Sequence, residues 1–273
     1  MKQRVAGLML AAGALYAQVE HARPAFEVAS IRPSNSADRR PYFGGDAGRF
    51  IANNVTVKKL IQNAYGVKDF QISVGPSWIG SDLFDISAKS ESSMRPEDLW
   101  LMMQSLLADR FKLVIRRETK EMPVYGLVVA KNGAKFREVK ESDPNMVDLS
   151  GRPELPPGVR PRFIILRRGR LTAQGVDMET LAFRLTDFLG RAVVDKTGLT
   201  AKYDLRLEWA PDENQVAMFQ AMGVPEGNGA PPPDWVGPSL YTALEEQLGL
   251  KLDSQKGPVE MFMIESVERP SGN

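Results

Sequence analysis

The sequence predicts an α+β fold of two related halves, with helices packed on one face of a mainly antiparallel sheet. The first observation behind this prediction is a repeat, because residues 48–60 (GRFIANNVTVKKL) and 169–181 (GRLTAQGVDMETL) align without a gap. In both copies a strand that begins with glycine runs into a residue able to cap a helix, Thr56 or Asp177. The second observation is a short alternating strand downstream of each copy, LFDISAK or KYDLRLE. The third is a helix followed by a β-hairpin, a unit that recurs four times along the chain.

Residues 1–17 have the pattern of a signal peptide, MKQRVAGLMLAAGALYA. Two basic residues precede an uncharged apolar stretch, and Ala17 offers a small residue for cleavage. The stretch is shorter than the roughly 20 residues that cross a bilayer, so we expect no membrane span in the mature chain. We therefore expect export to the periplasm or the extracellular space. The alternative is a buried N-terminal helix.

The first half is expected at residues 25–141. A helix is predicted over 57–65, because apolar residues recur there at intervals of three and four and a glycine follows. A second helix begins at Pro96, a favourable residue for a first turn. Residues 112–116 and 124–130 are then predicted to pair with each other as a hairpin.

A proline-rich linker at 142–160 separates the two halves, because so many prolines cannot sustain a helix or a central strand. The second half is expected at 161–270. It ends in a predicted hairpin formed by 250–254 and 259–267. It also contains an inserted loop at 212–237 that is rich in Met, Gly and Pro and that we expect to be unable to form a packed element. The repeat further predicts that the second half folds on its own.

Composition excludes several classes of protein. The net charge of +1, from 35 basic and 34 acidic residues, argues against a nucleic-acid partner. The chain has no cysteine, and its only histidine, His21, lies near the N-terminus. Thiolate nucleophiles, histidine triads and Cys/His metal clusters are therefore excluded from the folded body, which leaves carboxylate pairs, Ser–Lys dyads, tyrosine acids or oxygen-ligated metals. We expect no cofactor and no bound metal ion.

A few residues are candidates for a functional site. The sequence DKTG at 195–198 is shared with the phosphorylated motif of P-type ATPases, but a turn at the end of a strand explains it better. Two arginines in a charged run, Arg116 and Arg117, can bind an anion or pair with acids across a strand end. Apolar side chains in predicted loops either contact a partner or cover the edge of a core. These side chains are Trp78, Met218, Phe219, Met222 and Trp235.

Several stretches carry a resemblance to a known family: FEVASIRPS, NVTVKKLIQNAYGV, GPSWIGSDLFDISAK, GRAVVDKTGLTAKYDLRLEW and KGPVEMFMIESVERPS. Over nearly all of 26–273 the chain resembles the uncharacterised soil-associated family of exported bacterial proteins. That family has no established activity. Some relatives carry the same domain behind a membrane zinc-peptidase of the beta-lactam-sensor type, which implies an extracytoplasmic sensing or binding role. Relatives commonly have histidine at the position of Arg116, so no histidine chemistry carries over to this chain.

A second resemblance involves the stretches VDMETLAFRLTDFLGRAVVDKTG and ALEEQLGLKLDSQKGPVEMFMI. They are similar to the short N-terminal domains of secretins and TonB-dependent receptors, which implies a role in assembly or signalling. We therefore expect an exported, non-catalytic binding or assembly module of the cell envelope, with another envelope or secreted protein as its partner. The alternative is an extracytoplasmic hydrolase with a carboxylate or Ser–Lys site between the two halves. The oligomeric state stays open.

Overall fold

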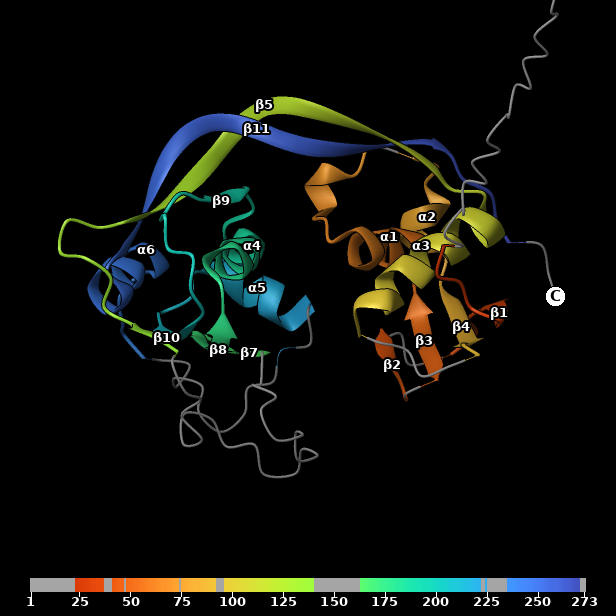
Figure 1. Cartoon of the computed structure of the whole chain (residues 1–273), viewed down its shortest axis with the longest axis horizontal. Coiled ribbons are helices and arrows are strands. Elements are labelled where there is room, and N and C mark those ends of the chain that lie inside the picture. Colours follow the sequence, from red (N-terminus) through yellow and green to blue (C-terminus); the bar gives the residue numbers. More distant parts are fainter. Residues whose placement is uncertain are drawn as a thin grey trace, which may run out of the picture.

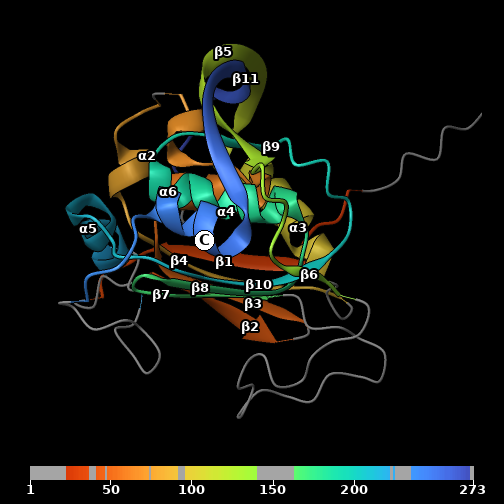
Figure 2. The same ribbon diagram turned by 90° about the vertical axis from the view of Figure 1, so that its left-hand side faces the viewer.

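The computed structural model describes residues 23–36, 41–46, 48–73, 75–91, 96–139, 163–221, 224 and 235–270. Two lobes lie side by side, each with a sheet covered on one face by helices, and a long two-stranded ribbon arches over both (Figure 1). Figure 2 shows the same layers from the side, with the sheets at one level, the helices above them and the ribbon on top. The α+β fold class is confirmed. The predicted signal peptide and proline-rich linker lie outside the described residues.

The first lobe is a four-stranded antiparallel sheet with the strand order β1-β4-β3-β2. Its strands are β1 (Val28–Pro33), β2 (Tyr42–Asp46), β3 (Arg49–Val55) and β4 (Phe84–Lys89). Its helices are α1 (Val57–Tyr65), the 3₁₀ turn η1 (Asp69–Gln71), α2 (Trp78–Ser81) and α3 (Pro96–Phe111). The helices bury their apolar stripes against the sheet and form one continuous core with it.

The second lobe repeats this arrangement, with the strand order β6-β10-β8-β7. Its strands are β6 (Arg137–Glu138), β7 (Phe163–Arg167), β8 (Arg170–Val176) and β10 (Tyr203–Glu208). Its helices are α4 (Met178–Leu189), α5 (Glu213–Ala221), α6 (Leu240–Ala243) and the π-helical turn η2 (Leu244–Leu248). No helix of the described part of the chain is both long and apolar enough to cross a membrane.

The sequence repeat corresponds to equivalent local structures in the two lobes. The Thr56 hydroxyl accepts a hydrogen bond from the Lys59 N–H at 3.1 Å and begins α1. The Asp177 carboxylate accepts one from the Thr180 N–H at 2.8 Å and begins α4. Each helix then ends at a left-handed glycine. The capping residues predicted from the sequence therefore open both helices.

The repeat also extends to a position with left-handed backbone geometry within each sheet. Asn54 and Gly175, which align in the repeat, both adopt positive φ angles of 54° and 62° at a bulge in β3 or β8. In the first lobe the Asn54 N–H donates to the Asp85 carboxylate at 3.0 Å, and in the second the Gly175 N–H donates to Asp204 at 2.7 Å. In each lobe, an aspartate at the equivalent position of the neighbouring strand thus stabilises the bulge.

The two predicted hairpins at 112–130 and 250–267 are wrong. Each region is instead one continuous strand, β5 (Val114–Val129) or β11 (Leu250–Ser266), and the two strands pair with each other along their whole length. Pro123 is compatible with β5 because its nitrogen lies on the outer edge of the ribbon. The Tyr125 N–H donates to Ala192 on the edge that faces away from β11, and Pro123, two residues earlier, needs no donor toward β11.

The ribbon exchanges strand ends between the lobes. Phe262, from the last strand of the chain, is 1% exposed and belongs to the core of the first lobe. Leu127, from the first half of the chain, is fully buried in the core of the second lobe. There β9 (Val193–Asp195) pairs in parallel with β5, and Ile72 forms a parallel bridge with Phe262 in the first lobe. The two lobes therefore differ from the predicted halves 25–141 and 161–270.

This exchange changes the expectation of independent folding. A fragment of residues 160–273 would lack Leu127 and the half-buried Phe136, which both pack in the core of the second lobe. It would also lack β6, which forms the edge of that sheet beside β10. We therefore no longer expect this fragment to fold alone.

The inserted loop predicted at 212–237 is wrong in its first part, because Glu213–Ala221 forms helix α5. The glycines and prolines that indicated a loop all follow this stretch, which contains neither residue type. Asp212 accepts a hydrogen bond from the Gln215 N–H at 2.9 Å and opens the helix. Phe219, which is 3% exposed, anchors α5 in the core of the second lobe.

Replacing Phe262 by alanine tests the strand exchange. We expect Phe262→Ala to lower the free energy of unfolding by about 3–5 kcal/mol, because the cavity would open in the core of the first lobe. Chemical denaturation measures the loss, and hydrogen exchange should show that α1 loses protection. The exposed ribbon residue Lys256 gives a control, since Lys256→Ala should change stability by only about 0.5 kcal/mol. Equal effects of the two substitutions would contradict the exchange.

Candidate functional site

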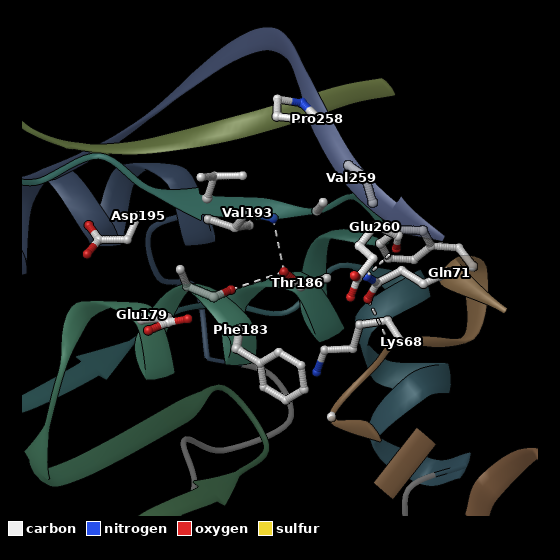
Figure 3. Close-up of a pocket in the computed structure, with 15 residues that line it drawn as sticks. Lys68, Gln71, Glu179, Phe183, Thr186, Val193, Asp195, Pro258, Val259 and Glu260 are labelled. Carbon is white, nitrogen blue, oxygen red and sulfur yellow. Dashed lines mark hydrogen bonds between the residues drawn. The ribbon is translucent and has the colours of Figure 1, made fainter. Parts of the chain in front are cut away.

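A cavity lies between the two lobes, beneath the ribbon. It has a volume of about 470 Å³. The segment after α1 forms its wall in the first lobe, and α4 and β9 form its wall in the second. Residues 258–260 of β11 cover it from above (Figure 3). The cleft therefore exists because the ribbon spans both lobes and leaves space below its centre.

One lysine joins the two walls. Lys68 follows α1, and its ammonium group forms an ion pair with Asp187 of α4 at an N–O distance of 2.6 Å. The same ammonium lies 3.4 Å from the centroid of the Phe183 ring, a cation–π contact. The Lys68 side chain is 12% exposed. Burial lowers the pKa of Lys68, and the hydrogen bond to Asp187 partly opposes that effect.

Thr186 fixes the wall of the second lobe. Its hydroxyl donates to the Ala182 carbonyl at 3.1 Å and accepts from the Val193 N–H at 3.0 Å, as Figure 3 shows. This residue thereby ties α4 to β9. Because both hydrogen bonds are internal to the fold, Thr186 acts as a structural support and not as a nucleophile.

Carboxylates lie at both ends of the cavity. Glu179 and Asp195 lie at one end, and Glu260 lies at the other beside Gln71, whose amide donates to the Glu260 carbonyl at 2.9 Å (Figure 3). Asp195 accepts hydrogen bonds from the N–H and the hydroxyl of Thr197 at 2.9 and 2.8 Å. With Gly198 at a φ of 72°, these bonds form the turn that the sequence predicted for DKTG.

The arrangement is suited to binding. Lys68 is already engaged by Asp187 and Phe183, and the described residues that line the cavity include no serine. In the described part of the chain, no three carboxylate or histidine side chains are grouped so that they could hold a metal ion. What the cleft offers is aromatic surface, backbone and side-chain amides, and charged groups of both signs.

The residues proposed from sequence lie in separate places. Trp78 is 9% exposed in the first lobe, where its ring meets Phe84 at a centroid distance of 6.4 Å. The Arg269 guanidinium covers it at 4.9 Å. Trp78 therefore covers the edge of the core of the first lobe, in the manner expected of an apolar residue in a predicted loop that packs on a core.

Arg116 and Arg117 lie on the ribbon and face acidic partners. Arg116 pairs with Glu118 and, at 2.8 Å, with Glu265 across the ribbon, and these carboxylates raise the pKa of Arg116. Arg117 lies 3.6 Å from Glu260. Both arginines therefore pair with acidic side chains across the ribbon, as expected for a solvated strand end.

The apolar candidates of the second lobe also do not form one surface. Phe219 packs against Phe188 and Trp209, with ring centroids 5.8 and 6.1 Å apart. Met218 is partly buried beside the same core and reaches the inter-lobe region. Trp235 is half-buried, and Met222 lies outside the described residues. None of the described candidates lines the large cavity.

Sequence reasoning missed the residues that do line the cleft. Lys68 follows the end of a helix, and Phe183 and Asp187 lie among polar residues on the less buried side of α4. No motif marks them, because their importance comes from the approach of the two lobes and not from local spacing. The glycine that ends α1 is the one nearby signal, since it turns the chain toward Lys68.

The shifted pKa of Lys68 gives a direct test of this geometry. We expect Lys68 to titrate below the ordinary lysine value of 10.5, because burial disfavours its charged form. The Cε resonances of the lysines, followed by NMR as pH rises, measure this. Asp187→Asn should lower the Lys68 pKa further, since it removes the charge that favours the ammonium. A Lys68 resonance that titrates with the exposed lysines would contradict the buried contact.

The sign of the effect on stability follows from the same shift. A lysine with a lower pKa in the folded chain binds fewer protons there than in the unfolded chain between its two pKa values. The free energy of unfolding should therefore rise with pH through that window, up to about 10.5, relative to a Lys68→Met variant.

Comparison with known proteins gives one match. A family model described as a protein of unknown function (DUF3738) matches residues 58–267, which is more than half of the chain. No curated protein and no solved structure matches.

Proposed function

The chain belongs to the DUF3738 family of proteins of unknown function, and we propose that it is an exported, non-catalytic binding module of the cell envelope. The observation that carries this proposal is the cavity between the lobes, bounded by both of them and covered by the ribbon. Its ligand is a component of the envelope or a secreted protein that inserts a small group or a chain segment into the cleft.

The size and position of the cavity support binding. A volume of about 470 Å³ lies within the usual range of roughly 300–1,000 Å³ for ligand pockets, which occur preferentially at domain interfaces. A ligand in this place contacts the segment after α1, the exposed side of α4 and the underside of β11 together. It therefore recognises the relative position of the lobes as well as individual side chains.

The chemistry of the walls favours binding over the alternative of a hydrolase. A Ser–Lys mechanism needs a free amine beside a serine, whereas the Lys68 amine is held by Asp187 and Phe183. A carboxylate mechanism remains the stronger form of the alternative, because Glu179 and Asp195 lie at one end of the cavity.

Location outside the cytoplasm rests on the sequence. The pattern of residues 1–17 and the resemblance to exported soil-associated proteins both support it. The fusion of some relatives to membrane peptidases of the beta-lactam-sensor type, and the likeness to secretin and TonB-receptor domains, support a partner in the envelope.

Export predicts a defined N-terminus. Protein recovered from its native host should begin near Gln18, because cleavage after Ala17 removes the signal peptide. Mass spectrometry of the intact protein from periplasmic, extracellular and cytoplasmic fractions measures this. Cytoplasmic protein that retains Met1 would rule out export.

Binding in the cleft is tested by a charge reversal at its edge. We expect the mature wild-type protein to retain specific envelope components from a native extract, and Glu179→Lys to lose them. Glu179 lies in the first turn of α4 and lines the cavity. Quantitative mass spectrometry of the retained material measures the difference.

Glu246→Lys provides the matched control. Glu246 is also an exposed glutamate in the first turn of a helical segment, but it lies outside the cavity. Its variant should retain what the wild type retains. Equal retention by both variants would place binding elsewhere. Turnover of ester or peptide substrates that disappears in Glu179→Gln, with the fold intact, would favour the hydrolase.

A further inference from the structure

A second cavity, of about 350 Å³, adjoins the first and shares Lys68, Phe70, Phe183 and Thr186 with it. It is bounded by α1 of the first lobe and α4 of the second, the two helices that begin in the sequence repeat. Lys59 projects to it from α1, and Arg184 from α4. Both side chains are exposed and therefore accessible to a ligand.

The charges around this cavity are not balanced. Its basic side chains are Lys59, Lys68 and Arg184, and its acidic ones are Asp69 and Asp187. Asp69 is already paired with Lys58 at 2.8 Å, and Gln62 donates to it at 2.9 Å. Asp187 is bonded to Lys68. Among the described residues, Lys59 and Arg184 are left without a carboxylate partner.

Lys59 and Arg184 are close enough to Lys68 to affect its charged form. Repulsion from Arg184 and from Lys59 adds to burial in lowering the pKa of Lys68. Lys59 belongs to the first lobe and Arg184 to the second, so the fold brings them to one cavity, whose two carboxylates are paired with Lys58 and Lys68 instead. A ligand that carries negative charge relieves this repulsion and contacts both lobes together.

We propose that the cavity between α1 and α4 binds a phosphate-type oxyanion, held by Lys59 and Arg184 and bordered by Lys68. A guanidinium offers two parallel donors that match two oxygens of such a group, and an ammonium adds a point charge. The oxyanion is either free phosphate or a monoester on a larger molecule, because the chemistry is the same. By bridging α1 and α4, the anion adds a second electrostatic contact between the lobes beside the Lys68–Asp187 ion pair.

The test uses the mature full-length protein at low ionic strength. Isothermal titration calorimetry with inorganic phosphate, and separately with glycerol 3-phosphate, measures the dissociation constants. We expect saturable binding of at least one of the two. Lys59→Gln and Arg184→Gln should each weaken it at least tenfold, and salt should weaken it in the wild type, since the contacts are electrostatic.

Lys131→Gln is the matched control, because it removes the same charge from an exposed lysine that does not line the cavity. It should change the dissociation constant less than twofold. Saturable binding of glycerol 3-phosphate alone would show that the site binds phosphate monoesters. Saturable binding of both probes would show that it also binds free phosphate. Absence of binding by either, or equal weakening in the control, would overturn the proposal.

This test is independent of the proposed envelope ligand. It uses defined anions and a cavity on the α1–α4 side, whereas the capture experiment uses Glu179 of the larger cavity. Loss of envelope capture with intact phosphate binding would contradict the proposed function alone. Intact capture without phosphate binding would contradict the anion site alone.

Discussion

The ribbon of β5 and β11 is the constraint on which the rest of the structure depends. Its backbone hydrogen bonds join the middle of the chain to its end, in one register from Leu250–Val129 to Ile264–Ile115. Each strand begins beside its own lobe and ends in the core of the other. Because core residues such as Phe262 and Leu127 come from the opposite half of the chain, the two halves of the chain cannot separate without unpairing the ribbon. The distance between the lobes, and hence the cleft, is set by the length of this paired segment.

Below the ribbon, polar and aromatic side chains form the contact between the two lobes. Burying the Lys68 ammonium costs free energy, which the ion pair with Asp187 and the face of Phe183 offset only in part. A contact of this kind specifies a distance and an orientation without contributing much stability. The Lys68–Asp187 contact also lies between two regions of different charge. The carboxylates Glu179, Asp195 and Glu260 line the larger cavity, whereas the cations Lys59 and Arg184, which have no carboxylate partner among the described residues, line the smaller one.

The sequence predicts the local elements of each lobe well and the connection between the lobes poorly. Caps, helix stripes and alternating strands are local patterns, so Thr56 and Asp177 could be assigned from neighbours a few residues away. The pairing of β5 with β11 joins residues more than a hundred positions apart. Both strands also contain a proline and a glycine, which are residues typical of turns. The same applies to α5, whose order depends on Phe219 meeting a core formed elsewhere. The cleft residues could not be predicted because they follow from the ribbon.

The exchanged strands relate the two lobes as the subunits of a domain-swapped homodimer are related, since each lobe completes its core with a strand from the other half of the chain. In a symmetric dimer of that kind, every residue of the cleft would occur twice. In this chain α4 has 12 residues against 9 in α1, and Asp187 lies in the added turn, which α1 lacks. A single chain can therefore form an asymmetric cleft that a symmetric dimer cannot.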